Sequence, residues 1–290
     1  MVADVAFAPV AGVPLTLAPD LALILAPNPS PMTYLGTNTF LLGRNQLAVI
    51  DPGPSDPDHL AALISAIDGR EVTHIFVTHS HLDHSPLASE LSAQTGAPIY
   101  AYGDSMAGRS ATMSKLAKNG LVGGGEGIDL DFRPDHTLPD GAQIFGDWGA
   151  ITAIHTPGHI GNHLCFQWGA AVFTGDHVMG WASSLVSPPD GDLTDFMTSC
   201  EKLKSLPAQI FYPAHGAPVL NTVQRLDWLI AHRKSREQQI INALRRCPSN
   251  TEALTNAIYH DTPNNLRPAA ERNVFAHLVD LHQRGEVKVQ

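Results

Sequence analysis

Histidines and aspartates are grouped in this sequence in a way that is typical of metal ligands. Residues 78–84 read THSHLDH. Alternate residues of an extended chain point in the same direction, so His79 and His81 can face one point, and Asp83 and His84 are free to face a second one. Three further candidates lie far downstream: His159, Asp176 and His215. Nitrogen-rich ligands without thiolate suit zinc, and few ligands per ion leave room for water.

Short apolar runs precede these residues and are predicted to be buried strands. The runs cover residues 46–50, 72–77, 150–154, 170–173 and 209–212, and each closes on a polar loop. Ligand-binding groups collect at the carboxyl ends of strands in open sheets. We therefore expect two zinc ions per chain, one held by His79, His81 and His159 and the other by Asp83, His84 and His215, with Asp176 bridging them.

Zinc lowers the pKa of bound water to about 7, so the expected chemistry is hydrolysis by metal-bound hydroxide. Asp83 is both a ligand and the candidate to orient the nucleophile or take its proton. His163 is a candidate to protonate a leaving group or touch substrate, as is His177, although each could simply start or cap an element. Asp51, directly after a strand, could fix the tautomer of a ligating histidine or form an Asx turn.

Other polar segments have simpler interpretations. Residues 37–39 (TNT) could line the pocket or form a turn, and residues 119–127, which contain GGGEG, are predicted to be a mobile loop near the cleft. His74 and His155 fit a satisfied position in the core. The basic run at residues 232–236 (HRKSR) could contact nucleic acid, but as part of a long helix it is predicted to be a solvated face. The solvated or structural interpretation also applies to His59, His136, His232, His260, His277 and His282.

Composition places the chain among ordinary globular proteins. Its 290 residues are 43% hydrophobic and 16% charged, which excludes a disordered, coiled-coil or collagen-like chain. Three scattered cysteines give neither a disulfide framework nor a cysteine-based zinc cluster. Residues 1–31 lack Lys and Arg, and their longest apolar run is too short to cross a bilayer. We expect a soluble cytoplasmic protein without a membrane partner.

Charge divides the chain near residue 221. The net charge of −10 is the sum of −13 over residues 1–220, with 8 basic and 21 acidic residues, and +3 over residues 221–290, with 10 basic and 7 acidic. The second part has helical patterns at 222–246, 251–260 and 266–284 and ends in the alternating sequence GEVKVQ. We predict a catalytic domain over 1–220 and a small winged-helix-like region of three helices and a short strand over 221–290.

The motif set resembles the metallo-β-lactamase-fold hydrolases over about residues 20–220: HxHxDH at 79–84, His159, the GD at 175–176 and the PAHG around His215. GTNTFLLG, HTPGHIGNH and HRKSREQQI look like the subgroup of mitochondrial β-lactamase-like endoribonucleases and their bacterial relatives; some fungal acyl-carrier-protein thioesterases look similar. The resemblance implies an α+β fold, a four-layer αβ/βα sandwich with a dinuclear metal site at one edge, and a winged-helix-like C-terminal region. The usual glycine pair after HxHxDH is replaced here by Ser85, Pro86 and Leu87, which removes no ligand.

Three functions are compatible with the sequence. The first is a dinuclear zinc hydrolase of an ester, thioester, lactone or lactam, acting on a small-molecule or acyl-carrier substrate. The second is a metal-dependent single-strand endoribonuclease, which the acidic balance of residues 1–220 disfavours because phosphate contacts depend on Lys and Arg. The third is a partner-binding module with a vestigial metal site, which the complete ligand set disfavours. Nothing in the sequence indicates an oligomeric state.

Overall fold

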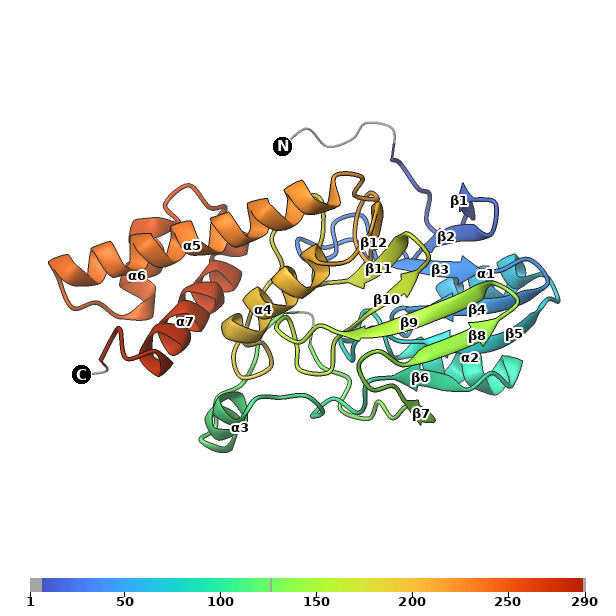
Figure 1. Ribbon diagram of the computed structural model, residues 1–290, viewed down its shortest axis with the longest axis horizontal. Helices are drawn as coiled ribbons and strands as arrows, with labels where there is room; N and C mark the ends of the chain where they lie inside the picture. The colour runs from blue at the N-terminus through green and yellow to red at the C-terminus, as the bar shows by residue number, and fades with distance from the viewer. Residues whose placement is uncertain (1–6, 126, 289–290) are drawn as a thin grey trace.

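Two β-sheets pack face to face in the computed structural model, which describes residues 7–125 and 127–288 (Figure 1). The first sheet has the order β1 (Leu15–Ala18), β2 (Leu21–Leu25), β3 (Asn38–Leu42), β4 (Gln46–Ile50), β5 (Glu71–Phe76), β6 (Ile99–Ala101) and β7 (His136–Thr137). The second has the order β12 (Ile210–Pro213), β11 (Ala171–Gly175), β10 (Leu164–Trp168), β9 (Gly149–His155) and β8 (Gln143–Gly146).

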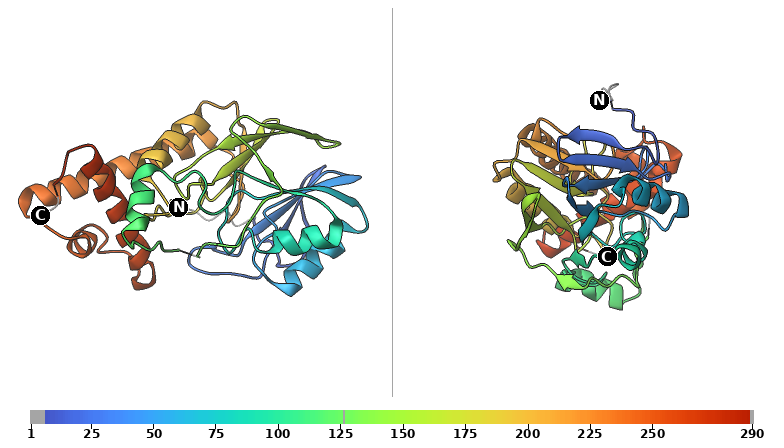
Figure 2. Two further views of the ribbon diagram at one scale, coloured as in Figure 1. Left: turned by 90° about the horizontal axis from the view of Figure 1, so that it is seen from below. Right: turned by 90° about the vertical axis from the view of Figure 1, so that its right-hand side faces the viewer.

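Helices cover the outer faces of both sheets. Helices α1 (Pro57–Ile67) and α2 (Leu87–Thr95) pack on the first sheet, where Leu63 and Leu91 are fully buried. Helix α4 (Leu193–Lys204) packs on the second sheet through Phe196 and Leu203, beside the start of α5 (Thr222–Arg246). A separate apolar cluster fills the space between the sheets, and Figure 2 shows the two sheets from one end. This is the four-layer arrangement that the resemblance implies.

The last part of the chain forms a helical tail beyond the sandwich. It consists of α5, α6 (Thr251–Ile258), a 3₁₀ turn (Asn264–Leu266) and α7 (Arg267–Gln283), with a small core of Ile240, Leu254, Val274 and Leu281. Helix α3 (Ala111–Lys118) lies beside the tail in both Figure 1 and Figure 2, and Gln283 donates a hydrogen bond to Thr112. The three predicted tail helices are present.

Two expectations for the tail are wrong. Residues 285–288 form no strand, because the backbone N–H groups of Gly285 and Glu286 bond to His282 and Leu281 and end α7 instead; residues 289–290 lie outside the described residues. The basic run is not a solvated face throughout, since Arg233 points inward and is only 2% exposed. No helix in the described part of the chain is long and apolar enough to span a membrane.

Strand direction brings the polar loops to one edge of the sandwich. Strands β4 and β5 are parallel in the first sheet, and β9, β11 and β12 run in one direction in the second. Two backbone hydrogen bonds join the sheets at this edge, from Leu164 N to Thr78 O and from Asn38 N to Ala214 O, each 2.7 Å. The loops after these five strands therefore meet at a fixed place.

Candidate metal centre

All seven predicted ligands meet at this edge and form two clusters that share one residue. The clusters are His79, His81, His159 and Asp176, and Asp83, His84, Asp176 and His215; within each, one ligand atom per residue lies within 4.8 Å of the others. Four separate loops supply them, after β5, β9, β11 and β12. The grouping is the one expected from the spacing of the residues.

The first cluster is rich in imidazole nitrogen. His81 Nδ1 lies 3.0 Å from both His79 Nε2 and His159 Nε2. Asp176 Oδ2 lies 3.5 Å from His159 Nε2. Three nitrogens and one oxygen at this separation converge on a point between them, which is the donor set of a tetrahedral zinc site.

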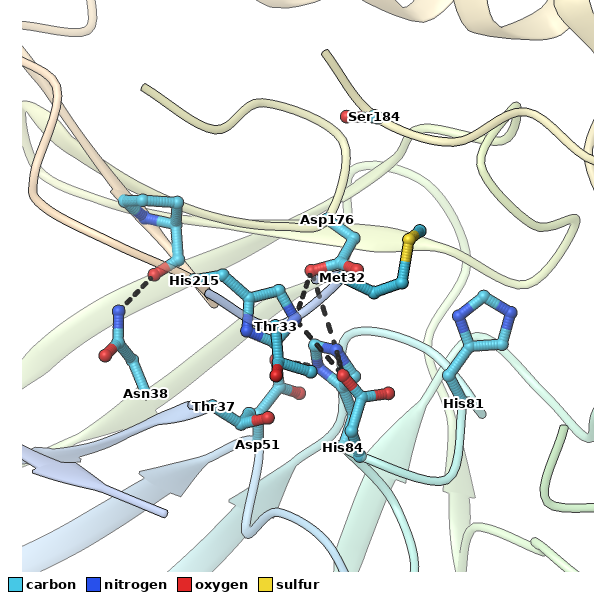
Figure 3. A network of polar contacts seen from close by, with 12 residues as sticks. Met32, Thr33, Thr37, Asn38, Asp51, His81, His84, Asp176, Ser184 and His215 are labelled. Carbon is cyan, nitrogen blue, oxygen red and sulfur yellow. Dashed lines mark hydrogen bonds and ion pairs between the residues drawn. The ribbon is translucent and has the colours of Figure 1, made fainter. Parts of the chain in front are cut away.

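The second cluster uses the other oxygen of Asp176. Asp176 Oδ1 lies 3.2 Å from His215 Nε2 and 3.5 Å from His84 Nε2, while Asp83 Oδ2 lies 3.1 Å and 3.3 Å from the same two nitrogens. Figure 3 shows His84, Asp176 and His215 facing one another. The carboxylate of Asp176 thus presents one oxygen to each cluster.

Neighbouring groups orient four of the five histidines through their second ring nitrogen. Nδ1 of His159 contacts Leu185 O at 2.7 Å, and Nδ1 of His215 contacts Gly36 O at 3.1 Å. Nδ1 of His84 contacts Asp51 Oδ2 at 3.0 Å, and Nδ1 of His79 contacts Thr78 Oγ1 at 3.0 Å. Each partner accepts the Nδ1 proton, so Nε2 is the ring nitrogen left to face the cluster and to bind a metal.

The hydrogen bonding of the buried ligand atoms shows whether these residues fit metal ions. Within the described residues, five buried ligand-type atoms make no hydrogen bond: Asp83 Oδ1, and the four atoms Asp83 Oδ2, His84 Nε2, Asp176 Oδ1 and His215 Nε2, which approach only one another, at 3.1–3.5 Å. Buried polar atoms are normally satisfied, and leaving several unsatisfied together is costly. A cation between them would satisfy them at once, so the residues fit a metal.

The protonation of the two clusters differs in the metal-free protein. Burial, with the neighbouring His159 and His84, lowers the pKa of His81 to about 3, and burial beside three other cluster histidines lowers that of His79. Burial also opposes the charged form of His215, but Asp176 and Asp83 outweigh it and raise its pKa to about 10. A metal ion in the second cluster would therefore displace a proton, whereas the first cluster presents neutral imidazoles.

His163 lies behind Asp176 and is completely buried. Its Nε2 accepts a hydrogen bond from the backbone N–H of Asp176 at 3.3 Å, so Nδ1 carries the proton and donates to Thr156 Oγ1 at 2.9 Å. Both ring nitrogens are occupied by the protein. This position indicates that His163 holds the Asp176 loop in place. It disfavours the role in substrate contact that the sequence suggested. His177 is equally buried, with Nε2 3.5 Å from Cys200 Sγ.

The side chains of residues 37–39 (TNT) make hydrogen bonds within the chain and do not line the pocket. Asn38 Nδ2 donates to Pro213 O and Gly216 O, each at 3.0 Å, and so holds the loop of His215. Thr39 Oγ1 donates to Asp51 O at 2.7 Å, and Thr37 is bonded to Asn28. The glycine-rich segment does lie beside the site, since Gly127 O accepts from Leu82 N and Ile128 pairs with His81.

An aromatic pair beside the site is not foreseeable from the sequence. Tyr34 and Trp181 stack with ring centroids 5.0 Å apart, and Trp181 lies against the Gly216 backbone next to His215. Tyr34 is 38% exposed, and Leu82, within the HxHxDH segment, is 45% exposed. Single aromatic residues in separate loops carry no spacing signal, so only the fold could bring them together.

Comparisons with known proteins agree with this geometry. The model of the Metallo-beta-lactamase superfamily matches residues 32–215, and that of the Beta-lactamase associated winged helix domain matches residues 251–290. A Beta-lactamase-like protein 2 homolog of Caenorhabditis elegans is 32% identical over 283 residues, covering 94% of this chain and 87% of that protein.

Two further matches concern a named activity and the fold. An atrochrysone carboxyl ACP thioesterase of Aspergillus fumigatus is 31% identical over 238 residues, which is 79% of this chain and 66% of that protein. The crystal structure of a beta-lactamase domain protein from Burkholderia ambifaria superposes with a TM-score of 0.81 at 21% identity, covering 99% of this chain and 92% of that one. At this identity the likeness concerns the fold alone.

Proposed function

Because the chain belongs to the metallo-beta-lactamase superfamily of hydrolases, we propose that it is a dinuclear zinc enzyme that hydrolyses an acyl bond, with an acyl-carrier thioester as the favoured substrate. The observation that carries the proposal is the pair of donor clusters that share Asp176. The proposed ligands are His79, His81 and His159 for one ion and Asp83, His84 and His215 for the other, with Asp176 between them.

The chemistry divides between the metal and the chain. Bound zinc lowers the pKa of water to about 7 and polarises a substrate carbonyl. Asp83 turns Oδ2 toward His84 and His215, while Oδ1 has no hydrogen-bond partner in the described structure. We assign to Oδ1 the task of orienting the attacking water and holding its proton.

The accessible side of the site supports an acyl substrate. His81, Asp83, His159 and Asp176 are each 4–8% exposed, whereas His79, His84 and His215 are at most 1% exposed, so substrate approaches over the first four. Tyr34, Trp181 and Leu82 give the surroundings apolar surface. A polyanion would need cations here, and residues 1–220 hold only 8 basic residues against 21 acidic ones.

Domain organisation and location are part of the proposal. We place the boundary between the catalytic and winged-helix-like regions at 220/221, next to the start of α5 at Thr222. The name of the fungal relatives supports an acyl-carrier protein as the partner that delivers substrate, although this chain spans about two thirds of their length. We propose a cytoplasmic location.

A substrate panel tests the activity. Zinc-loaded protein is assayed with an acyl-carrier thioester, a lactone, a β-lactam and end-labelled single-stranded RNA, with Asp83→Asn as the control against contaminating enzymes. We expect thiol release from the thioester and a loss of at least about a hundredfold in Asp83→Asn, because one positioned proton acceptor contributes about 10²–10⁴-fold. RNA cleavage that disappears in Asp83→Asn, with no acyl turnover, would replace this proposal with the ribonuclease function.

A further inference from the structure

Helix α5 contributes a buried arginine that the hydrolytic chemistry does not use. Arg233 is 2% exposed and lies in the basic run of the HRKSREQQI segment. Within the described structure no carboxylate lies within ion-pair distance of it. Its guanidinium instead faces a backbone carbonyl, an amide oxygen and the ring of Phe196, 5.1 Å from the ring centroid. A charge buried without a counter-charge is costly, so the fold keeps Arg233 here at the expense of stability.

Those contacts hold residues 184–187, which run past the metal centre. Arg233 Nη2 donates to Ser184 O, and Nη1 donates to Asn273 Oδ1 at 2.8 Å. The same Asn273 oxygen accepts from Val186 N at 3.1 Å. Side chains of two tail helices, α5 and α7, therefore hydrogen-bond this segment on both sides of Leu185.

Leu185 is the link to the candidate ligands. Its carbonyl oxygen accepts the Nδ1 proton of His159 at 2.7 Å, which directs Nε2 of His159 toward His81. Ser184 Oγ also donates to His177 O at 2.9 Å, and Figure 3 places Ser184 above the Asp176 loop. A shift of residues 184–187 would move the acceptor that sets the orientation of His159.

We propose that Arg233 and Asn273 are positioning residues of the metal centre, which hold His159 in place through the Leu185 carbonyl. The inference rests on the proposed metal centre and assigns the helical tail a part in building it. Groups that hydrogen-bond a ligand directly, as Leu185 O does, typically change metal affinity 10–100-fold when replaced, and Arg233 and Asn273 act one step further out, on the residues that flank Leu185.

Variants of the full chain test the link. Arg233→Met keeps length and removes both hydrogen bonds, Asn273→Ala removes the shared acceptor, and Asn273→Asp keeps an acceptor oxygen. Arg236→Met is the matched control. Arg236 lies three residues away on α5 and also covers an aromatic ring, Tyr259, but its hydrogen bonds among the described residues stay within the tail, to Gln239 and Ile258. Folding is checked by circular dichroism, and metal affinities are measured by chelator competition with Zn²⁺ and Co²⁺.

The expected result is selective. In Arg233→Met and Asn273→Ala one of the two equivalents should bind at least about tenfold more weakly, with a changed Co²⁺ absorption spectrum. Asn273→Asp and Arg236→Met should bind both equivalents as the parent does. If Arg233→Met does not fold, Asn273→Ala decides. Folded variants with unchanged affinities and spectra would overturn this inference alone, whereas a parent protein that binds no metal would overturn the proposed function as well.

Discussion

The carboxylate of Asp51 reaches both clusters of candidate ligands. Oδ2 contacts Nδ1 of His84 at 3.0 Å and accepts from Thr78 Oγ1 at 2.8 Å, and that hydroxyl in turn accepts from His79. Oδ1 accepts from Thr78 N at 2.7 Å. One buried acid thus sets the tautomer of a ligand in each cluster, which favours the first of the two roles that the sequence left open.

His163 gives a prediction at the scale of a residue. His163→Ala should lower hydrolysis of thioesters with good and poor leaving groups by the same factor, about tenfold or more, because it loosens Asp176 rather than removing a proton donor. Initial rates with a series of thiol leaving groups measure how the loss of activity depends on the pKa of the leaving group. A loss that grows with the pKa of the leaving group would instead assign His163 to acid catalysis.

Sequence spacing works best for residues whose chemistry is local. The HxHxDH segment, together with one residue from each of the loops that follow β9, β11 and β12, supplies all members of the two clusters, because the carboxyl ends of these strands meet by topology. The sequence predicts a solvated Arg233 because a charged helix residue is usually solvated. Its burial depends on Ser184 and Asn273, 49 and 40 residues away, and no local pattern encodes those partners.

The end of β11 shows how an element delivers a ligand. Gly175 has φ +47° and turns the chain so that Asp176 faces both clusters. A methyl group on Gly175 would lie 2.6 Å from His163 Nε2 and 2.8 Å from Thr78 Oγ1. Both neighbours take part in orienting the site, so the glycine is required for close approach as well as for its backbone conformation.

Gly175→Ala should therefore reduce metal binding, while Gly169→Ala should not. Gly169 has φ +56°, and a methyl group placed there would have no neighbouring atom within 4 Å. Both changes thus cost about 1 kcal/mol of left-handed strain, but only Gly175→Ala causes a clash. Zinc content after dialysis and the free energy of unfolding in urea separate the two effects. Equal metal content in both variants would contradict the role given to this turn.

Some helices and strands can be predicted from their own residues and others cannot, and the difference has a physical reason. The run 46–50 is β4 as expected, and helix α1 begins at Pro57, where the side chain of Asp56 caps it. The sequence patterns do not single out strands β3 and β10 or helix α4. Strand β10 pairs on both edges with β9 and β11, and strand preference depends mainly on such neighbours rather than on the segment itself.

At the scale of the molecule, buried neutral histidines make stability depend on pH. His277 in α7 is 1% exposed, and neither ring nitrogen has a hydrogen-bond partner in the described structure. Burial, with nearby Arg233, lowers its pKa to about 3 from the usual 6.5. The folded state therefore disfavours the proton that the unfolded chain accepts, so its contribution is present above pH 6.5 and is lost as the pH falls toward 3.

The metal-free protein should thus lose stability below pH 6.5, and His277→Leu should lessen the loss by up to about 1.4 kcal/mol per pH unit. Urea unfolding between pH 7.5 and 4.5 with chelator present measures this without metal release. His260→Leu is the control, because the side chain of His260 is 70% exposed. A His277→Leu slope equal to that of the parent would contradict the assigned protonation.

The uneven distribution of charge along the chain is also a property of the whole molecule. Residues 1–220, which include the candidate metal centre, have a net charge of −13, and residues 221–290 have +3. The tail is nevertheless joined to the site by Arg233, by Asn273 and by Arg272, which donates to Val122 O in the glycine-rich segment. The sequence indicates the change in composition near 221 but not this connection, because it is made by single side chains across the interface.

The metal content of purified protein and of Asp176→Ala tests the central claim most directly. Mass spectrometry of protein loaded with excess zinc and then desalted should find close to two zinc ions per chain in the parent. Asp176→Ala should lose at least one, because Oδ1 and Oδ2 of Asp176 face different clusters. A parent protein without bound metal, or an Asp176→Ala variant that retains both ions, would contradict a shared dinuclear centre.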